Sequence, residues 1–125
     1  MKLTELSAIS PIDGRYSKLV TELQGIVSEY ALIKYRVFVE IEWFIHLSKQ
    51  QNIKELPPLT KQSISFLSKI EKNFNLAEAR KVKNIEKKTN HDVKAVEYYL
   101  RDQFIKSKQL KGLVEFIHFG CTSED

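Results

Sequence analysis

Residues 88–100 read KTNHDVKAVEYYL, a polar turn that becomes an apolar-patterned segment. From the middle of this stretch onward, hydrophobic residues recur at the spacing of an α-helix and predict one buried stripe: Val93, Val96, Leu100 and Phe104. Thr89 is expected to cap the helix, with Asp92 three residues further on as in a capping box. The stretch therefore predicts an amphipathic helix that begins in a polar turn.

The start of this helix has three consecutive polar residues, although one capping side chain would be enough. Asn90, His91 and Asp92 place an amide, an imidazole and a carboxylate where the backbone N–H groups of a helix start point outward. Such a terminus attracts anions and favours a neutral imidazole, which is the chemistry of a binding or catalytic site. The residues alone leave a second interpretation open, in which Asn90 and Asp92 compete for the cap and His91 is solvated.

The longest periodic segment covers residues 28–51. Its apolar residues recur every three or four positions and predict a buried stripe: Tyr30, Ile33, Val37, Ile41, Phe44 and Ile45. Arg36 and Glu40 have i,i+4 spacing and are expected to pair with each other on the outer side of this helix.

Shorter helices are predicted on both sides of the long one. Thr60 and Asn75 are expected to cap two of them, and residues 17–25 and 113–117 favour further short helical segments. No segment shows the sustained alternation that is typical of strands. We therefore predict an all-α fold, a small multi-helix domain that spans residues 1–125 as a single unit.

Composition limits the classes of function. The chain of 125 residues has 42% hydrophobic and 29% charged residues, as expected for a soluble globular chain. Its net charge of +4 comes from 20 basic residues interleaved with 16 acidic ones, which favours a solvated surface over a nucleic-acid interface. Cys121 is the only cysteine, and no stretch predicts a signal peptide or a membrane span. We expect a cytoplasmic protein that has no membrane partner.

Two other polar clusters suit an anionic ligand. The turn of residues 10–16 presents Arg15 and Tyr16, whose guanidinium and phenol groups can both donate to a phosphate. Thr122 and Ser123 offer two adjacent hydroxyls and two backbone amides to a carboxylate or phosphate oxygen. The alternatives are a surface arginine beside a packed tyrosine, and a cap for a following helix.

Three segments together resemble the adenylosuccinate lyase family, most closely its bacterial branch. They are residues 10–16 (SPIDGRY), 86–98 (EKKTNHDVKAVEY) and 115–125 (EFIHFGCTSED). The resemblance implies an all-α homotetramer of the fumarase/aspartase superfamily, acting in the cytoplasm without a metal or organic cofactor. It also implies a carbon–nitrogen lyase that releases fumarate from adenylosuccinate to give AMP, and from the succinylo-carboxamide ribotide in the pathway to IMP and purines.

The same resemblance implies substrate-binding roles for the two upstream clusters. Arg15 and Tyr16 match positions that grip the nucleotide phosphate. Asn90, His91 and Asp92 match a trio that binds substrate near the phosphate and the reacting atoms.

The downstream cluster is implied to bind the other end of the substrate. Thr122 and Ser123 match hydroxyls that hold the succinyl group, and His118 matches a histidine that lines the pocket in some relatives. The family's general base, a serine on a mobile loop, and its general acid, a histidine, belong to later motifs that do not occur in these 125 residues. We therefore expect an N-terminal lyase domain that contains no catalytic residue, lacks the central helix bundle and C-terminal domain, and is inactive alone.

Two other classes of function remain open from the residues. A helical nucleotide- or RNA-binding module is suggested by the positive charge and by the lysines of residues 81–88. An interaction scaffold would use the polar clusters only as helix caps.

Overall fold

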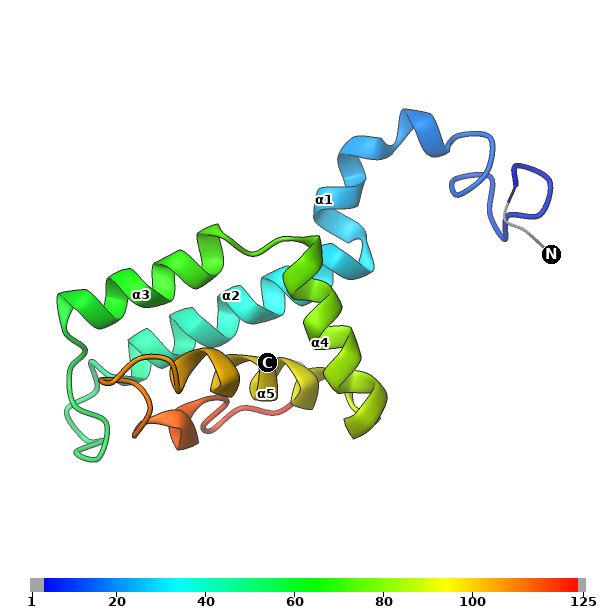
Figure 1. Cartoon of the computed structure of the whole chain (residues 1–125). Helices are drawn as coiled ribbons and strands as arrows, with labels where there is room; N and C mark the ends of the chain where they lie inside the picture. Colours follow the sequence, from blue (N-terminus) through cyan, green and yellow to red (C-terminus); the bar gives the residue numbers. More distant parts are fainter. Residues whose placement is uncertain (1–3, 124–125) are drawn as a thin grey trace. The chain divides into compact units, whose positions relative to one another are not determined.

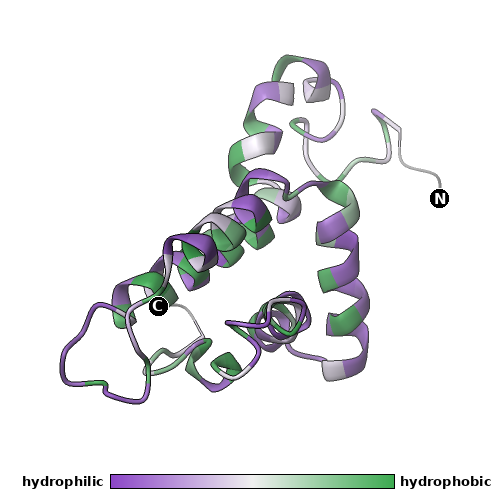
Figure 2. Cartoon of the chain, turned by 60° about the vertical axis from the view of Figure 1, so that its left-hand side comes forward, coloured by the Kyte–Doolittle hydropathy of each residue, from purple (hydrophilic) through white to green (hydrophobic). Residues whose placement is uncertain are grey.

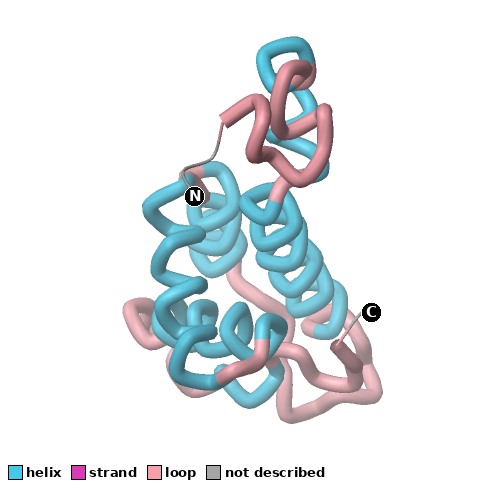
Figure 3. The backbone as a smooth tube through the Cα atoms, turned by 90° about the vertical axis from the view of Figure 1, so that its right-hand side faces the viewer, coloured by secondary structure: helices cyan, strands magenta, loops and turns pink. Residues whose placement is uncertain are grey.

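The computed structural model describes residues 4–123. Helices and turns build this part of the chain, and no strand occurs in it (Figure 3), which confirms the all-α prediction. The chain divides between Leu32 and Ile33 into two compact units, a short first one and a larger second one. None of the helices in residues 4–123 combines the length and apolarity needed to cross a lipid bilayer.

The first unit, which ends at Leu32, consists of tight turns. After the turn that contains Gly14 come η1 (Ser17–Leu19), η2 (Thr21–Leu23), α1 (Gln24–Val27) and the first residues of α2. These short elements confirm the helical character predicted for this region. Several large apolar side chains of this unit are more than half exposed: Leu6, Ile9, Ile12, Leu19, Ile26 and Val27.

The second unit contains the longer helices. These are α2 (Glu29–Leu47), most of which lies here, followed by α3 (Lys61–Lys72), α4 (Leu76–Thr89), α5 (Asp92–Phe104) and the 3₁₀ turn η3 (Val114–Phe116). In Figure 1, α4 leads from the end of α3 to the start of α5. The predicted caps are confirmed, because the Thr60 side chain accepts from Ser63 N at 3.1 Å and the Asn75 side chain accepts from Ala77 N at 2.9 Å.

The two predicted apolar stripes meet in the core of the second unit. On α2 the buried side chains include Ile33, Val37, Ile41 and Phe44, and on α5 they include Val93, Val96, Leu100 and Phe104. Figure 2 shows that hydrophobic and hydrophilic residues are interspersed on the helices. Phe44 and Phe104 pack edge to face, with ring centroids 4.9 Å apart and planes at 75°. This contact joins α2 to α5 at the centre of the unit.

A buried tyrosine of α5 is hydrogen-bonded to the first turn of α4. The Tyr99 hydroxyl donates to Glu78 Oε2 at 2.8 Å, and Lys81 pairs with the other oxygen of the same carboxylate at 2.7 Å. Burial and the neighbouring Glu78 raise the pKa of Tyr99, whereas the hydrogen bond from Lys81 lowers the pKa of Glu78. The bonded pair fixes α4 against α5 and so positions the turn between them.

Candidate functional site

The turn between α4 and α5 carries the central polar cluster. Asn90 ends α4 in the left-handed conformation, with φ 52° and ψ 33°, and its N–H donates to Glu86 O at 2.7 Å. Asparagine tolerates this conformation better than most residues do, so the chain can turn sharply here. The observed role of Asn90 at the helix end is therefore one of its backbone.

His91 caps α5, and the predicted cap at Thr89 is wrong. Thr89 is the last residue of α4, and its hydroxyl donates to His91 O at 3.1 Å. His91 has extended backbone angles, and its Nδ1 accepts from Lys94 N at 3.1 Å. The left-handed residue between them moves the start of α5 two residues beyond the predicted position.

The capping bond defines the tautomer of His91. A ring nitrogen that accepts from a backbone N–H carries no hydrogen, so the neutral ring has its hydrogen on Nε2. The carboxylate oxygen of Asp92 nearest to Nδ1 is 3.7 Å away. The two groups are close but do not form an ion pair, because Nδ1 accepts a hydrogen bond and therefore carries no proton to share with the carboxylate. With its side chain 50% exposed, His91 offers Nε2–H as a donor beside the positive end of α5.

Asp92 is held from two directions. Its Oδ1 accepts from Val93 N at 2.8 Å, and its Oδ2 accepts from Arg36 Nη1 at 2.7 Å. The hydrogen bond from Val93 is the largest cause that lowers the pKa of Asp92; burial opposes it, and the Arg36 guanidinium adds to the lowering. The ion pair attaches the start of α5 to α2.

Asp92→Asn is expected to lower stability at neutral pH but not in strong acid. The folded-state pKa of Asp92 lies below its ordinary value near 3.8, so its stabilisation is present above that value and is lost as the pH falls through the folded pKa. For a half-exposed ion pair we expect a loss of about 0.5–1 kcal/mol at pH 7. Urea unfolding at pH 7 and below pH 3 measures it, with the exposed Asp102→Asn on the same helix as the control. An equal loss at both pH values would contradict the assigned ion pair.

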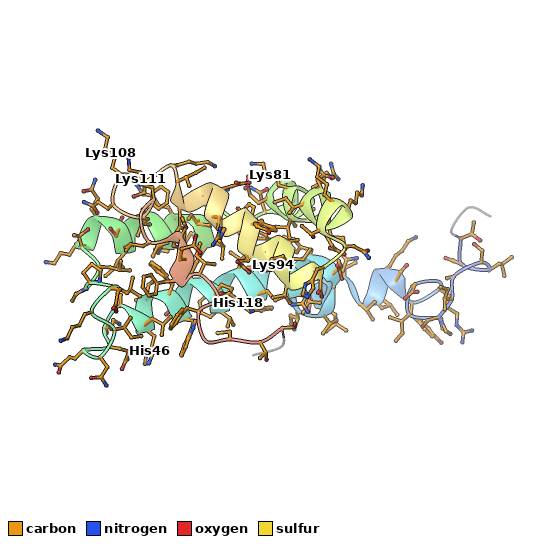
Figure 4. The ribbon with its side chains drawn as sticks, turned by 90° about the horizontal axis from the view of Figure 1, so that it is seen from below. His46, Lys81, Lys94, Lys108, Lys111 and His118 are labelled. Atoms are coloured by element: carbon orange, nitrogen blue, oxygen red, sulfur yellow. The ribbon has the colours of Figure 1, made fainter. Side chains whose placement is uncertain are left out.

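His118 is held by a carboxylate of α2. Glu40 Oε1 pairs with His118 Nδ1, and Glu40 Oε2 accepts from the His118 backbone N–H at 3.1 Å. The Glu40 side chain is 10% exposed and the His118 side chain 18%. Figure 4 labels His118 beside α2. The backbone at His118 has φ 60°, which few residues other than glycine adopt.

The predicted pairing of Arg36 with Glu40 is wrong, and the actual contacts are more informative. Arg36 binds Asp92 in the segment of residues 86–98, while Glu40 binds His118 in the segment of residues 115–125. Residues four apart lie on the same face of a helix, about 5–6 Å from each other. One face of α2 therefore brings together two motifs that are distant in the sequence. The sequence pattern gave no signal for these partners beyond the two charges themselves.

The segment after His118 lies alongside α2. Trp43 Nε1 donates to Phe119 O at 2.8 Å, and Gly120 has a positive φ of 74°. A hollow of about 300 Å³ lies here, lined by Val39, Glu40, Trp43, Gly120 and Cys121. Beyond it, the predicted hydroxyl-bearing pair, Thr122 and Ser123, is exposed to solvent.

Arg15 and Tyr16 belong to the first unit. Both are exposed, and the Arg15 guanidinium carbon lies 4.7 Å from the centroid of the Tyr16 ring. Gly14 before them is buried, and a Cβ there would lie 3.0 Å from Glu5 O, so the turn requires glycine by close approach. The turn thus presents a preorganised cation–aromatic pair to solvent.

No group of three or more His, Cys, Asp and Glu side chains suited to a metal ion is found within residues 4–123.

Comparison with known proteins gives the class of this chain. A family model described as Lyase matches residues 14–125, which is most of the chain. The chain therefore belongs to this lyase family.

Within that class, the chain is similar to adenylosuccinate lyases of bacteria. It is 55% identical to "Adenylosuccinate lyase" of Legionella pneumophila (strain Corby), 50% to that of Haemophilus influenzae and 47% to that of Escherichia coli (strain K12). Each comparison covers 125 residues, which are 100% of this chain and 27% of the relative, in the relative's N-terminal region. The chain thus spans about a quarter of the length of these relatives. The similarity favours the lyase prediction over the RNA-binding module and the scaffold.

Proposed function

We propose that this chain forms the substrate-binding N-terminal part of a lyase that cleaves adenylosuccinate into fumarate and AMP. The same site would act on the succinylo-carboxamide ribotide of purine biosynthesis, in a cytoplasmic homotetramer, without a cofactor. The observation that carries the proposal is the 55% identity to the Legionella pneumophila relative over all 125 residues. The attachment of two polar motifs to one face of α2 supports it independently.

The Arg15–Tyr16 pair is proposed to bind the nucleotide phosphate. A guanidinium donates two parallel hydrogen bonds to phosphate oxygens, and a phenol donates a third beside it. The stacking of Arg15 over the Tyr16 ring limits the conformations of both side chains, which lowers the entropy lost on binding.

The α4–α5 turn is proposed to bind the substrate near its reacting atoms. His91 supplies Nε2–H as a neutral donor, and the start of α5 adds a positive dipole end that suits an anionic substrate. Asp92 is already bonded to Arg36 and Val93, so its role in the proposal is to hold the turn. Asn90 contributes the left-handed backbone that turns the chain toward His91.

Thr122 and Ser123 are proposed to hold the succinyl carboxylate, beside a pocket wall that includes His118. In the elimination, a base removes a proton from the carbon next to that carboxylate, the carbon–nitrogen bond breaks, and an acid protonates the leaving nitrogen. Negative charge builds on the carboxylate, so donors placed there stabilise the transition state. The base and the acid are proposed to come from the part of the lyase that lies beyond the matched region.

A chimeric enzyme tests this function. This chain replaces the matched 125 residues of the Legionella pneumophila relative, and fumarate release from adenylosuccinate is measured. We expect the chimera to turn over adenylosuccinate within about tenfold of the parent rate, because the two sequences are 55% identical over the replaced residues. The isolated chain is expected to release no fumarate.

The parent enzyme, assayed in parallel, is the control for expression and assembly. A chimera that has the parent's mass in solution but releases no fumarate would contradict the proposed function. Fumarate release by the isolated chain at the parent's rate would contradict the expected dependence on the rest of the lyase.

A further inference from the structure

Glu40 and His118 form a largely buried carboxylate–imidazole pair whose purpose the fold alone does not explain. Their side chains are 10% and 18% exposed, and they join α2 to a segment 78 residues further along the chain. Burying a carboxylate is costly unless it is paired and hydrogen-bonded. An apolar contact would hold the segment without that cost, so the pair suggests a chemical role.

We propose that Glu40 is a positioning residue, which sets the tautomer of His118 and the path of the backbone toward Thr122 and Ser123. The proposal rests on the proposed function for its effect on the reaction. The pairing itself stands on the geometry of the chain.

The two oxygens of Glu40 are both engaged by His118. A carboxylate only accepts hydrogen bonds, so the neutral His118 ring carries its hydrogen on Nδ1. Within residues 4–123, His118 Nε2 forms no hydrogen bond, and as the unprotonated nitrogen it is an acceptor. A carboxylate that sets a histidine tautomer in this way is a recurrent device in protein sites.

The two histidines of the motifs therefore have opposite character. His91 accepts at Nδ1 from a backbone amide and donates through Nε2–H, whereas His118 donates at Nδ1 to Glu40 and accepts at Nε2. A ligand group that meets His118 must then be a donor, such as a hydroxyl or amino group. This assignment gives Glu40 an influence on which substrate group is recognised.

Glu40 also restrains an unfavourable stretch of backbone. His118 has φ 60°, and the chain remains unusual at Gly120 with φ 74°. The bond from His118 N to Glu40 Oε2 and the bond from Trp43 Nε1 to Phe119 O hold this path against α2. Without Glu40 the segment loses the attachment at His118, which lies four residues before Thr122 and five before Ser123.

The tautomer can be measured directly on the 125-residue chain. Its only histidines are His46, His91 and His118, so ¹⁵N-imidazole spectra at alkaline pH resolve each ring. We expect the Nδ1–H form for His118 and loss of that preference in Glu40→Ala, which removes both acceptor oxygens. Glu42→Ala, an exposed change on the same helix, is the matched control and should leave His118 unchanged. An Nε2–H ring in the unmodified chain, or identical spectra in Glu40→Ala, would overturn the assignment.

Kinetics of the chimeric lyase separate positioning from stability. Glu40→Gln is expected to lower kcat by about 10–100-fold per folded enzyme, by analogy with the loss found when the carboxylate partner of a metal-binding histidine is removed. A lower melting temperature with unchanged kcat per folded enzyme would show a purely structural role and overturn the positioning proposal. If the unmodified chimera is inactive, the proposed function fails, and the imidazole spectra still decide the pairing of Glu40 with His118.

Discussion

Phe44→Ala is expected to destabilise the chain by about 3–5 kcal/mol. Phe44 is 1% exposed on α2, and its ring packs edge to face against Phe104 of α5, with centroids 4.9 Å apart. Truncation removes the transfer free energy of the ring and leaves a cavity that neighbouring helices fill only in part. Because a domain of this size is stable by only about 5–15 kcal/mol, the loss is a large fraction of the total.

The matched control is Phe38→Ala, the same substitution on the same helix. Phe38 is 47% exposed, so its truncation should cost less than about 1 kcal/mol. Urea unfolding followed by far-ultraviolet circular dichroism measures both, without relying on the fluorescence of the neighbouring Trp43. Similar midpoints for the two variants would show that α2 does not present Phe44 to the core.

Local sequence predicted the parts of this fold that depend on local interactions. Thr60 and Asn75 cap helices because their side chains reach backbone N–H groups two or three residues ahead, whatever the rest of the chain does. The stripe on α5 follows from one period repeated over three turns. The start of α5 was misplaced because Asn90 takes a left-handed conformation, so that His91 rather than Thr89 caps the helix.

The contacts that build the candidate site are of a different kind. Arg36 and Glu40 fit the spacing of a pair on one helix, and only the arrangement of α2, α5 and the third motif shows that each binds elsewhere. The partners are 56 and 78 residues away in sequence. Pairing over such separations depends on the tertiary arrangement, which helical periodicity does not encode. The resemblance to a family identified the candidate residues, and the structure identified the residues of α2 that bind two of them, Asp92 and His118.

Replacing His91 in the chimeric lyase is expected to lower kcat/KM by about 10–100-fold. The proposed Nε2–H bond to an anionic substrate is a hydrogen bond to a charged group, which is worth about 1.5–3 kcal/mol, and each 1.4 kcal/mol is tenfold in rate. His91 also caps α5 through Nδ1, so His91→Ala removes two interactions at once. That variant should lose about 0.5–2 kcal/mol of stability together with activity.

His91→Asn separates the two roles. Asparagine is among the best N-cap residues, and its side-chain oxygen can accept from Lys94 N as Nδ1 does in the structure. The variant should therefore recover the stability lost in His91→Ala, as measured by urea unfolding, while kcat/KM stays low, because no imidazole donor faces the substrate. If His91→Asn keeps the full kcat/KM of the chimera, the imidazole is only a helix cap, and the α4–α5 turn does not bind substrate through it. If it recovers neither stability nor activity, the hydrogen bond to Lys94 N is not what holds the start of α5.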